Sequence, residues 1–267
     1  MEFSLPEFPS APGAQAAFVA AAIGILLGLA LLLFPQFTGR FVGLESRETR
    51  TGAIGELRAS GGFLVGLSLS ALMFDQPVLY TALGCAFALA AFGRIISLMS
   101  DQAATFLNFL LLGVQIVLAG ATLYYFFEVF TPDMQFAMPA EPAVRLVFYS
   151  FGLAAALGAI ALFAPRIACR AAGLQAIADS GITSVRSAGG LAVGLGLYGL
   201  LMSALSDSAP IMTMMAALAF GAALGFGVIG RIVALVVNRG NYVFAGLALV
   251  LQAACTFVVL SYVKGMM

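Results

Sequence analysis

The chain has 267 residues, of which 62% are apolar and only 9% charged, and its formal net charge is zero. Soluble domains carry roughly 25% charged residues, so a chain this apolar must lie in a bilayer. The absence of His removes the usual neutral-pH base and the commonest metal ligand. The zero net charge gives no reason to expect nucleic acid as a partner, and no motif calls for a cofactor.

The chain opens with a polar arm at residues 1–14, where Glu2 and Glu7 replace the basic residues of a secretory signal. Eight apolar runs follow, each close to the roughly 20 residues that a bilayer-spanning helix needs. We predict an all-α integral membrane protein with transmembrane helices at 15–35, 60–76, 78–99, 104–128, 143–164, 188–206, 209–236 and 241–263. Pro35 and Pro165 are expected to end the first and the fifth helix.

The predicted helices form two tandem four-helix repeats. The first repeat spans 15–130, a Pro-rich linker spans 131–142, and the second repeat spans 143–267. The motif Arg-Ala-Ser-Gly-Gly at 58–62 has an echo, Arg-Ser-Ala-Gly-Gly, at 186–190. Because each half has an even number of helices, the repeat is parallel. Its pseudo-twofold axis should therefore run along the membrane normal.

The repeated motif also predicts how the helices pack. Arg58, Gly62 and Gly66 are spaced i, i+4 and i+8, so they share one helix face. Small residues on a helix face allow two helix backbones to approach closely. Gly190 and Gly194 repeat the spacing in the second half. We therefore expect close helix packing at both places.

The basic residues predict the orientation in the membrane. Ten of the 12 basic residues fall in or beside loops on one side, and only Arg145 and Lys264 lie on the other. The positive-inside rule places the Arg-rich side in the cytoplasm and both termini outside it. The long Arg-rich stretches at 37–57 and 166–185 are expected to be interfacial helices or ordinary loops.

Four charged residues of the first half are expected to meet at the Arg-rich membrane face. Glu56 and Arg58 lie at one helix end, and the following helical hairpin returns Arg94 and Asp101 to the same side. Two acids and two arginines would neutralise each other. We therefore predict a self-neutralised structural cluster.

In the second half Arg186 and Arg231 are kept, but Ser184 and Asn238 stand where the first half has its acids. The two guanidinium groups would then be uncompensated. Arg offers a planar donor fork that matches a phosphate, so they are candidates to hold an anionic headgroup or a ligand phosphate. The alternative is that all four arginines only anchor helices at the interface.

Gln115 and Gln252 fall about eleven residues into the fourth and the eighth helix, near mid-membrane at 1.5 Å per residue. A polar amide there must find a partner, because lipid offers none. It would either line a substrate cavity or bond another helix through a hydroxyl or a carbonyl. A proton-coupled carrier would carry a mid-helix carboxylate, and the helices contain none.

The sequence gives no indication of an enzyme. It contains no metal-ligand cluster, nucleophile elbow or phosphate-binding loop. Glu56 and Asp101 could do acid–base work on a lipid head only if a substrate-sized pocket formed beside Arg58 and Arg94. We therefore expect a non-enzymatic protein and keep a lipid-modifying enzyme as the third interpretation.

One set of positions carries a family likeness: Glu56, Arg58, Gly61, Gly62, Gly93, Arg94, Ser97 and Asp101. This pattern resembles a bacterial membrane family catalogued as domain of unknown function 4345, a four-helix unit of roughly half this length. The resemblance implies that each half is one such unit in the bacterial inner membrane. The second copy departs from the pattern at Ser184, Ala234 and Asn238. The family supplies no activity to carry over.

These patterns favour an integral membrane scaffold or binding protein. Its partners would be membrane lipids, a hydrophobic ligand, a partner membrane protein or a second copy of the chain. The alternative is a transporter or channel for a small uncharged or anionic solute at the repeat interface. A continuous polar cavity reaching Gln115 and Gln252 would favour transport, whereas a closed interior would favour the scaffold.

Overall fold

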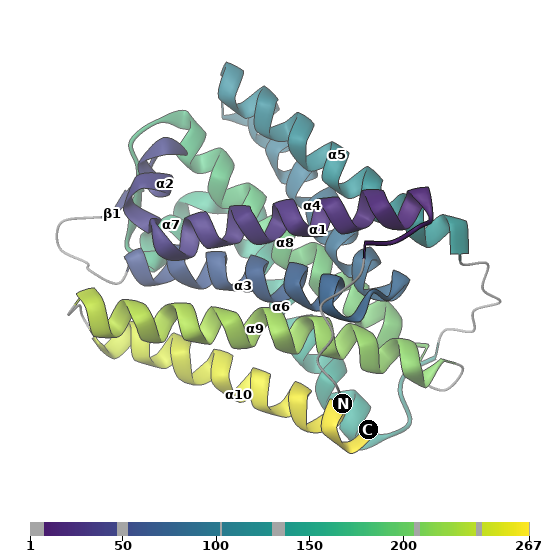
Figure 1. Ribbon diagram of the computed structural model, residues 1–267. Coiled ribbons are helices and arrows are strands. Elements are labelled where there is room, and N and C mark those ends of the chain that lie inside the picture. The colour runs from purple at the N-terminus through teal and green to yellow at the C-terminus, as the bar shows by residue number, and fades with distance from the viewer. Residues whose placement is uncertain are drawn as a thin grey trace.

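The computed structural model describes residues 8–46, 53–101, 103–129, 137–205, 209–238 and 242–266, and most of these are helical. Eight helices are long and apolar enough to cross a membrane, as predicted. They are α1 (Pro12–Leu33), α3 (Ala53–Phe74), α4 (Pro77–Ser100), α5 (Phe106–Val129), α6 (Pro142–Phe163), α8 (Asp179–Ser203), α9 (Pro210–Asn238) and α10 (Tyr242–Met266). Figure 1 shows most of these helices side by side in one bundle, with α3 between α1 and α9.

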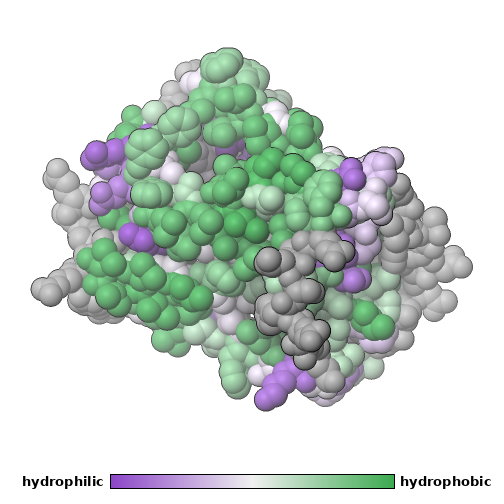
Figure 2. All heavy atoms as spheres, in the orientation of Figure 1, coloured by the Kyte–Doolittle hydropathy of each residue, from purple (hydrophilic) through white to green (hydrophobic). Residues whose placement is uncertain are grey.

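The outer surface is apolar over the middle of the bundle. In the view of Figure 2, hydrophobic residues cover the centre of the molecule, and hydrophilic residues gather towards its ends. Large apolar side chains are exposed on α1, α5 and α10, among them Leu26 at 66%, Val117 at 67% and Leu247 at 68%. An apolar band of this kind suits contact with lipid chains.

Two helices begin earlier than the hydropathy predicts. We expected helices from 60 and 188, whereas α3 begins at Ala53 and α8 at Asp179. The predicted starts were wrong because charged residues look like loop residues in an apolar profile. Here Arg58 and Arg186 lie inside helices, where protein atoms accept their hydrogen bonds.

Prolines begin six of the helices, α1, α2, α4, α6, α7 and α9. The first helical position has no intrahelical partner for its N–H, so proline fits there without cost. The first and fifth spans end at Leu33 and Phe163, as expected, and Pro35 and Pro165 start new short helices.

The stretches expected to be interfacial helices or loops contain helices and a small sheet. The short helices are α2 (Pro35–Phe41) and α7 (Pro165–Ala172). Strand β1 (Leu44–Ser46) then pairs antiparallel with β2 (Leu174–Ala176). This strand pair, which the sequence did not predict, joins the two stretches. Gly43 and Gly173 precede the strands at φ +84° and +72°, a conformation that favours glycine.

The first half packs against the second through two helix pairs, α3 with α9 and α4 with α8. The predicted glycine faces lie in these pairs. A β-carbon at Gly62 or Gly66 would overlap backbone atoms of α9, and one at Gly190 or Gly194 would overlap backbone atoms of α4. Close packing at both places is therefore confirmed.

The remaining long helices pack outside this centre. Helix α1 lies against α3 and α5, and α6 lies against α8 and, less extensively, against α10. Helix α5 covers α4, and α10 covers α9. The buried apolar core runs through both halves and includes Leu67, Leu83, Phe151, Leu195 and Phe220.

Candidate functional site

Asp101 and Arg186 form an ion pair between the halves, at the end of α4 and inside α8. Arg186 Nε donates to Asp101 Oδ2 at 2.7 Å, and Arg186 Nη2 donates to Asp101 Oδ1 at 3.2 Å. The side chains are only 11% and 13% exposed. Arg186 Nη1 donates to the carbonyl oxygen of Leu162, at the end of α6, at 2.7 Å. The guanidinium is thus held by the other half and by its own half at once.

Hydroxyl and amide groups extend this ion pair into the bundle. Ser97 donates from its hydroxyl to Asp101 at 2.7 Å and lies 2.8 Å from the hydroxyl of Thr183. Asn108, which is fully buried on α5, donates to the carbonyl of Ala103 at 2.7 Å and to Thr183 at 3.4 Å. Lipid cannot satisfy such groups, so their mutual bonding allows them to be buried.

Arg94 is the buried cation of the same region, with only 4% of its surface exposed. Its Nε donates to Gln115 Oε1 at 3.1 Å, and its Nη1 donates to Asn108 Oδ1 at 2.9 Å. Gln115 in turn donates to the hydroxyl of Ser187 on α8 at 2.7 Å. We call this set the α4–α8 network: Arg94, Ser97, Asp101, Asn108, Gln115, Thr183, Arg186 and Ser187.

A second set, the α3–α9 network, consists of Glu56, Arg231 and Gln252. Arg231 donates to both carboxylate oxygens of Glu56, from Nη1 to Oε1 and from Nη2 to Oε2 at 2.7 Å. Arg231 Nε donates to Gln252 Oε1 at 2.6 Å. Gln252 donates to the carbonyl oxygen of Leu224 on α9 at 3.1 Å. Here too an acid of the first half pairs with an arginine of the second.

Arg58 takes part in neither of these two ion pairs. Its Nη1 donates to the carbonyl oxygen of Leu32, at the end of α1, at 2.7 Å. Its Nε is buried and has no hydrogen-bond partner among the residues that the structure describes. Arg58 is therefore an arginine of the Arg-rich end with an unsatisfied buried donor.

The predicted self-neutralised cluster does not form. Arg94 and Asp101 do share one network, but Glu56 pairs with Arg231 instead of joining them. The prediction was wrong because it paired charges within each half. The packing of α3 on α9 and of α4 on α8 instead brings charges of opposite halves together.

The prediction that the second half has two arginines without a compensating charge was also wrong. Arg186 and Arg231 both have carboxylate partners. The arginines without a carboxylate within hydrogen-bonding distance, in the described part of the chain, include Arg58 and Arg94 of the first half. Ser184 bonds the carbonyl oxygens of Val42 and Ser180, and the side chain of Asn238 lies outside what the structure describes.

Gln115 and Gln252 make the interhelical bonds that one of the two interpretations expected. The Gln115 amide donates to a hydroxyl, and the Gln252 amide donates to a backbone carbonyl oxygen. Each amide oxygen also accepts a hydrogen bond from an arginine. The arginine contacts were not predicted. Asn108 was also missed, although it stands seven residues before Gln115 in an apolar run, on the same helix face.

Asp101 lies just beyond the apolar span of α4, as the residue that follows its last turn. Burial alone would raise the pKa of its carboxyl group. Hydrogen bonds from Arg186 and Ser97 and the positive charge of Arg186 outweigh burial, so the pKa of Asp101 is below its ordinary value. The ion pair therefore persists at neutral pH.

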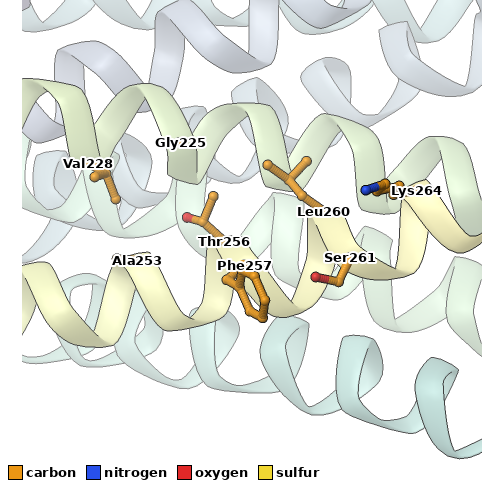
Figure 3. Close-up of a pocket in the computed structure, with 8 residues that line it drawn as sticks. All are labelled: Gly225, Val228, Ala253, Thr256, Phe257, Leu260, Ser261 and Lys264. Atoms are coloured by element: carbon orange, nitrogen blue, oxygen red, sulfur yellow. The ribbon is translucent and has the colours of Figure 1, made fainter.

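A groove of about 410 Å³ lies on the outside of the bundle between α9 and α10. Gly225 and Val228 contribute to it from α9 (Figure 3). The α10 residues lie on one face of that helix and are Ala253, Thr256, Phe257, Leu260, Ser261 and Lys264. The walls are mostly apolar, and Lys264, near the end of α10, is the charged group among the described residues that line the groove.

No protein-family model, no curated protein and no solved structure matches the chain.

Proposed function

We propose that this chain is a non-enzymatic membrane protein that binds one anionic phospholipid in the groove between α9 and α10. The observation that carries the proposal is the composition of this groove: an apolar channel with a hydroxyl, Ser261, and a cation, Lys264, at one end. An acyl chain suits the apolar part. A phosphate suits the Lys264 end, because Lys is a compact cation with three donors.

The position of Lys264 supports the same occupant. Lys264 stands in the last turn of α10 and is exposed. In a helix that spans the bilayer, this level corresponds to the lipid headgroups. Lys264 and a lipid phosphate would then meet at the depth where both are solvated. The groove volume of about 410 Å³ is within the range of small-molecule sites, roughly 300–1,000 Å³.

The polar interior supports binding over transport. Gln115 and Gln252 use their amide groups to bond arginines and neighbouring helices. The two amide groups would have to break these hydrogen bonds before they could line a path for a solute. The networks therefore favour a role in fixing the two halves together, as a scaffold requires.

One observation favours transport of a small anion as a second candidate. Arg94 is buried and bonded to two neutral amides, and no carboxylate of the described residues lies within hydrogen-bonding distance of it. An anion passing between the halves would find a cation there. The test is anion efflux from liposomes that contain the purified protein. Efflux above that of empty liposomes, lost in Arg94→Gln, would favour this candidate.

We also propose that the halves are a tandem duplication, related by a pseudo-twofold axis along the membrane normal. Corresponding contacts support it: Arg58 and Arg186 each bond the carbonyl at the end of the preceding long helix. Arg94 and Arg231 each bond a glutamine 21 residues later. The resemblance of each half to the four-helix family of unknown function agrees with this proposal.

The proposed location is the bacterial inner membrane, with the Arg-rich end in the cytoplasm and both termini outside. The charge bias between the two sides supports this orientation. A reporter fused to the C-terminus, active only outside the cytoplasm, tests it. A cytoplasmic reporter signal would overturn the orientation.

The groove is tested with an anionic phospholipid that carries a photoactivatable group on its acyl chain. After illumination and digestion, we expect the label on peptides from α9 and α10. Gly225→Leu should remove the label, because a β-carbon at Gly225 meets only Thr256 at 3.6 Å and the rest of the side chain would extend into the groove. The matched control is Gly246→Leu on α10, where a β-carbon meets nothing within 4 Å.

Equal labelling of wild type and Gly225→Leu, or labelling spread evenly over all the helices, would overturn the proposal. A second protein chain cross-linked to α10 in place of the lipid would also overturn it, in favour of a protein partner.

A further inference from the structure

Among the described residues, Arg58 repeats one of the four hydrogen bonds that the Arg186 side chain makes. Both side chains donate Nη1 to a backbone carbonyl oxygen at the end of the preceding long helix, Leu32 for Arg58 and Leu162 for Arg186, each at 2.7 Å. Arg186 then uses Nε and Nη2 to hold both oxygens of Asp101. The same edge of Arg58 has no carboxylate partner in the described part of the chain, and its Nε is buried without a hydrogen bond.

An unsatisfied charged donor at this depth needs an explanation. A buried N–H without a partner is costly, and more so when it belongs to a cation. Arg40, a nearby arginine of the same end, is solvated instead: its side chain is 70% exposed and bonded to Glu45. Arg58 is only partly exposed and its Nε is buried, so solvent does not serve all its donors.

We infer that Arg58 binds an oxyanion through its Nε and Nη2 edge, with two oxygens of one phosphate group in the place that Asp101 takes on Arg186. The guanidinium fork matches such a group in a planar, two-point contact. The phosphate of a lipid headgroup and free inorganic phosphate share this chemistry.

This site is separate from the groove between α9 and α10. Arg58 lies near the start of α3, at the end of the bundle where α2 and β1 lie, whereas α10 ends with Lys264 at the opposite end (Figure 1). The inference does not rest on the proposed function. Loss of lipid from the groove would leave the site at Arg58 in place, and the reverse also holds.

The chain contains no Trp, so one introduced indole reports on one place. Phe34→Trp puts it two residues beyond Leu32, at a side chain that is 64% exposed. The protein is reconstituted in phosphatidylcholine vesicles with a fixed share of phosphatidylglycerol. Two samples are prepared: in one the phosphatidylcholine is brominated, and in the other the phosphatidylglycerol is brominated. Quenching of the indole by each brominated lipid then gives their relative occupancy beside Arg58.

We expect the brominated anionic lipid to be preferred by roughly fivefold or more, since one basic residue at an anionic surface already gives about this factor. Arg58→Gln should reduce the preference to about one. Arg58→Lys, which keeps the charge but not the fork, should retain only part of it. Arg40→Gln, the matched control at the same end, should leave it unchanged, because Glu45 already compensates the charge of Arg40.

Inorganic phosphate distinguishes the two sources of the anion. If millimolar phosphate abolishes the preference at constant ionic strength, the site takes soluble phosphate; if the preference persists, the site takes the lipid headgroup. The inference is overturned if both brominated lipids quench equally in the Phe34→Trp protein and phosphate does not raise its melting temperature. It is also overturned if Arg40→Gln lowers the preference as much as Arg58→Gln, because general surface charge would then explain it.

Discussion

Asp101 and Arg186 belong to different halves of the chain, yet the carboxylate accepts two hydrogen bonds from the guanidinium, at 2.7 and 3.2 Å. Glu56 and Arg231 repeat the exchange between α3 and α9. In each pair the first half supplies the acid and the second half the arginine. Because both ion pairs cross from one half to the other, they favour one relative placement of the halves.

Removing the charge of Asp101 should therefore destabilise the protein strongly. Asp101→Asn leaves the buried Arg186 without its counter-charge, and breaking a buried pair costs about 3 kcal/mol or more. Thermal unfolding in mild detergent measures the loss. Glu45→Gln, which breaks the exposed pair with Arg40, is the control and should cost less than about 1 kcal/mol. Equal effects of the two substitutions would contradict the role of the cross-half pair.

The pH dependence of stability should follow the same carboxylate. The pKa of Asp101 is lower in the folded protein than its ordinary value of about 4, so the unfolded chain binds the proton more readily. The stabilisation is fully present above about pH 4 and is lost as the pH falls through the lower, folded pKa. The melting temperatures of wild type and Asp101→Asn should converge as the pH falls below 4. If the difference between the two melting temperatures stayed constant below pH 4, Asp101 would not be the source of the pH dependence.

The glycine faces predict a sharp contrast between two alanine substitutions. Gly190→Ala places a β-carbon against the carbonyl of Leu89, which forces α4 and α8 apart and should cost about 1–3 kcal/mol. Gly113→Ala, on α5, meets nothing within 4 Å and should be neutral or stabilising by up to about 1 kcal/mol. Unfolding of both variants in the same detergent tests the contrast, and a harmless Gly190→Ala would refute the close approach.

The glutamines should matter for stability and not for the groove. Gln115→Leu takes away the acceptor of Arg94 Nε and the donor to Ser187, and should cost about 1–3 kcal/mol. Phospholipid retained by the folded variant should equal that of wild type. If a stably folded Gln115→Leu protein instead lost its lipid or an anion flux, the network would belong to the functional site.

Much of the architecture could be predicted from the sequence because lipid imposes simple rules. Long apolar runs must be helices, and glycines four apart bring helix backbones together, so the eight long apolar helices and the faces of Gly62 and Gly190 are confirmed. Helix starts were less certain. Charged residues such as Glu56 lower the hydropathy of a segment, although inside the bundle they are paired and helical.

The partners of the charged residues could not be predicted in the same way. The order of residues along the chain brings Arg94 and Asp101 to one end, and both do lie in one network. Which acid meets which arginine depends on how the halves pack, and a residue pattern within one half carries no such information. The orphaned donor of Arg58 depends on that packing too, so it became visible only in three dimensions.

The most direct test of the proposed function is native mass spectrometry of the full chain extracted in a mild detergent. We predict that the protein retains one phospholipid of anionic type, and that Gly225→Leu, which fills the groove, does not retain it. A bare wild-type chain, or the same lipid in equal amount on both proteins, would contradict a phospholipid site between α9 and α10.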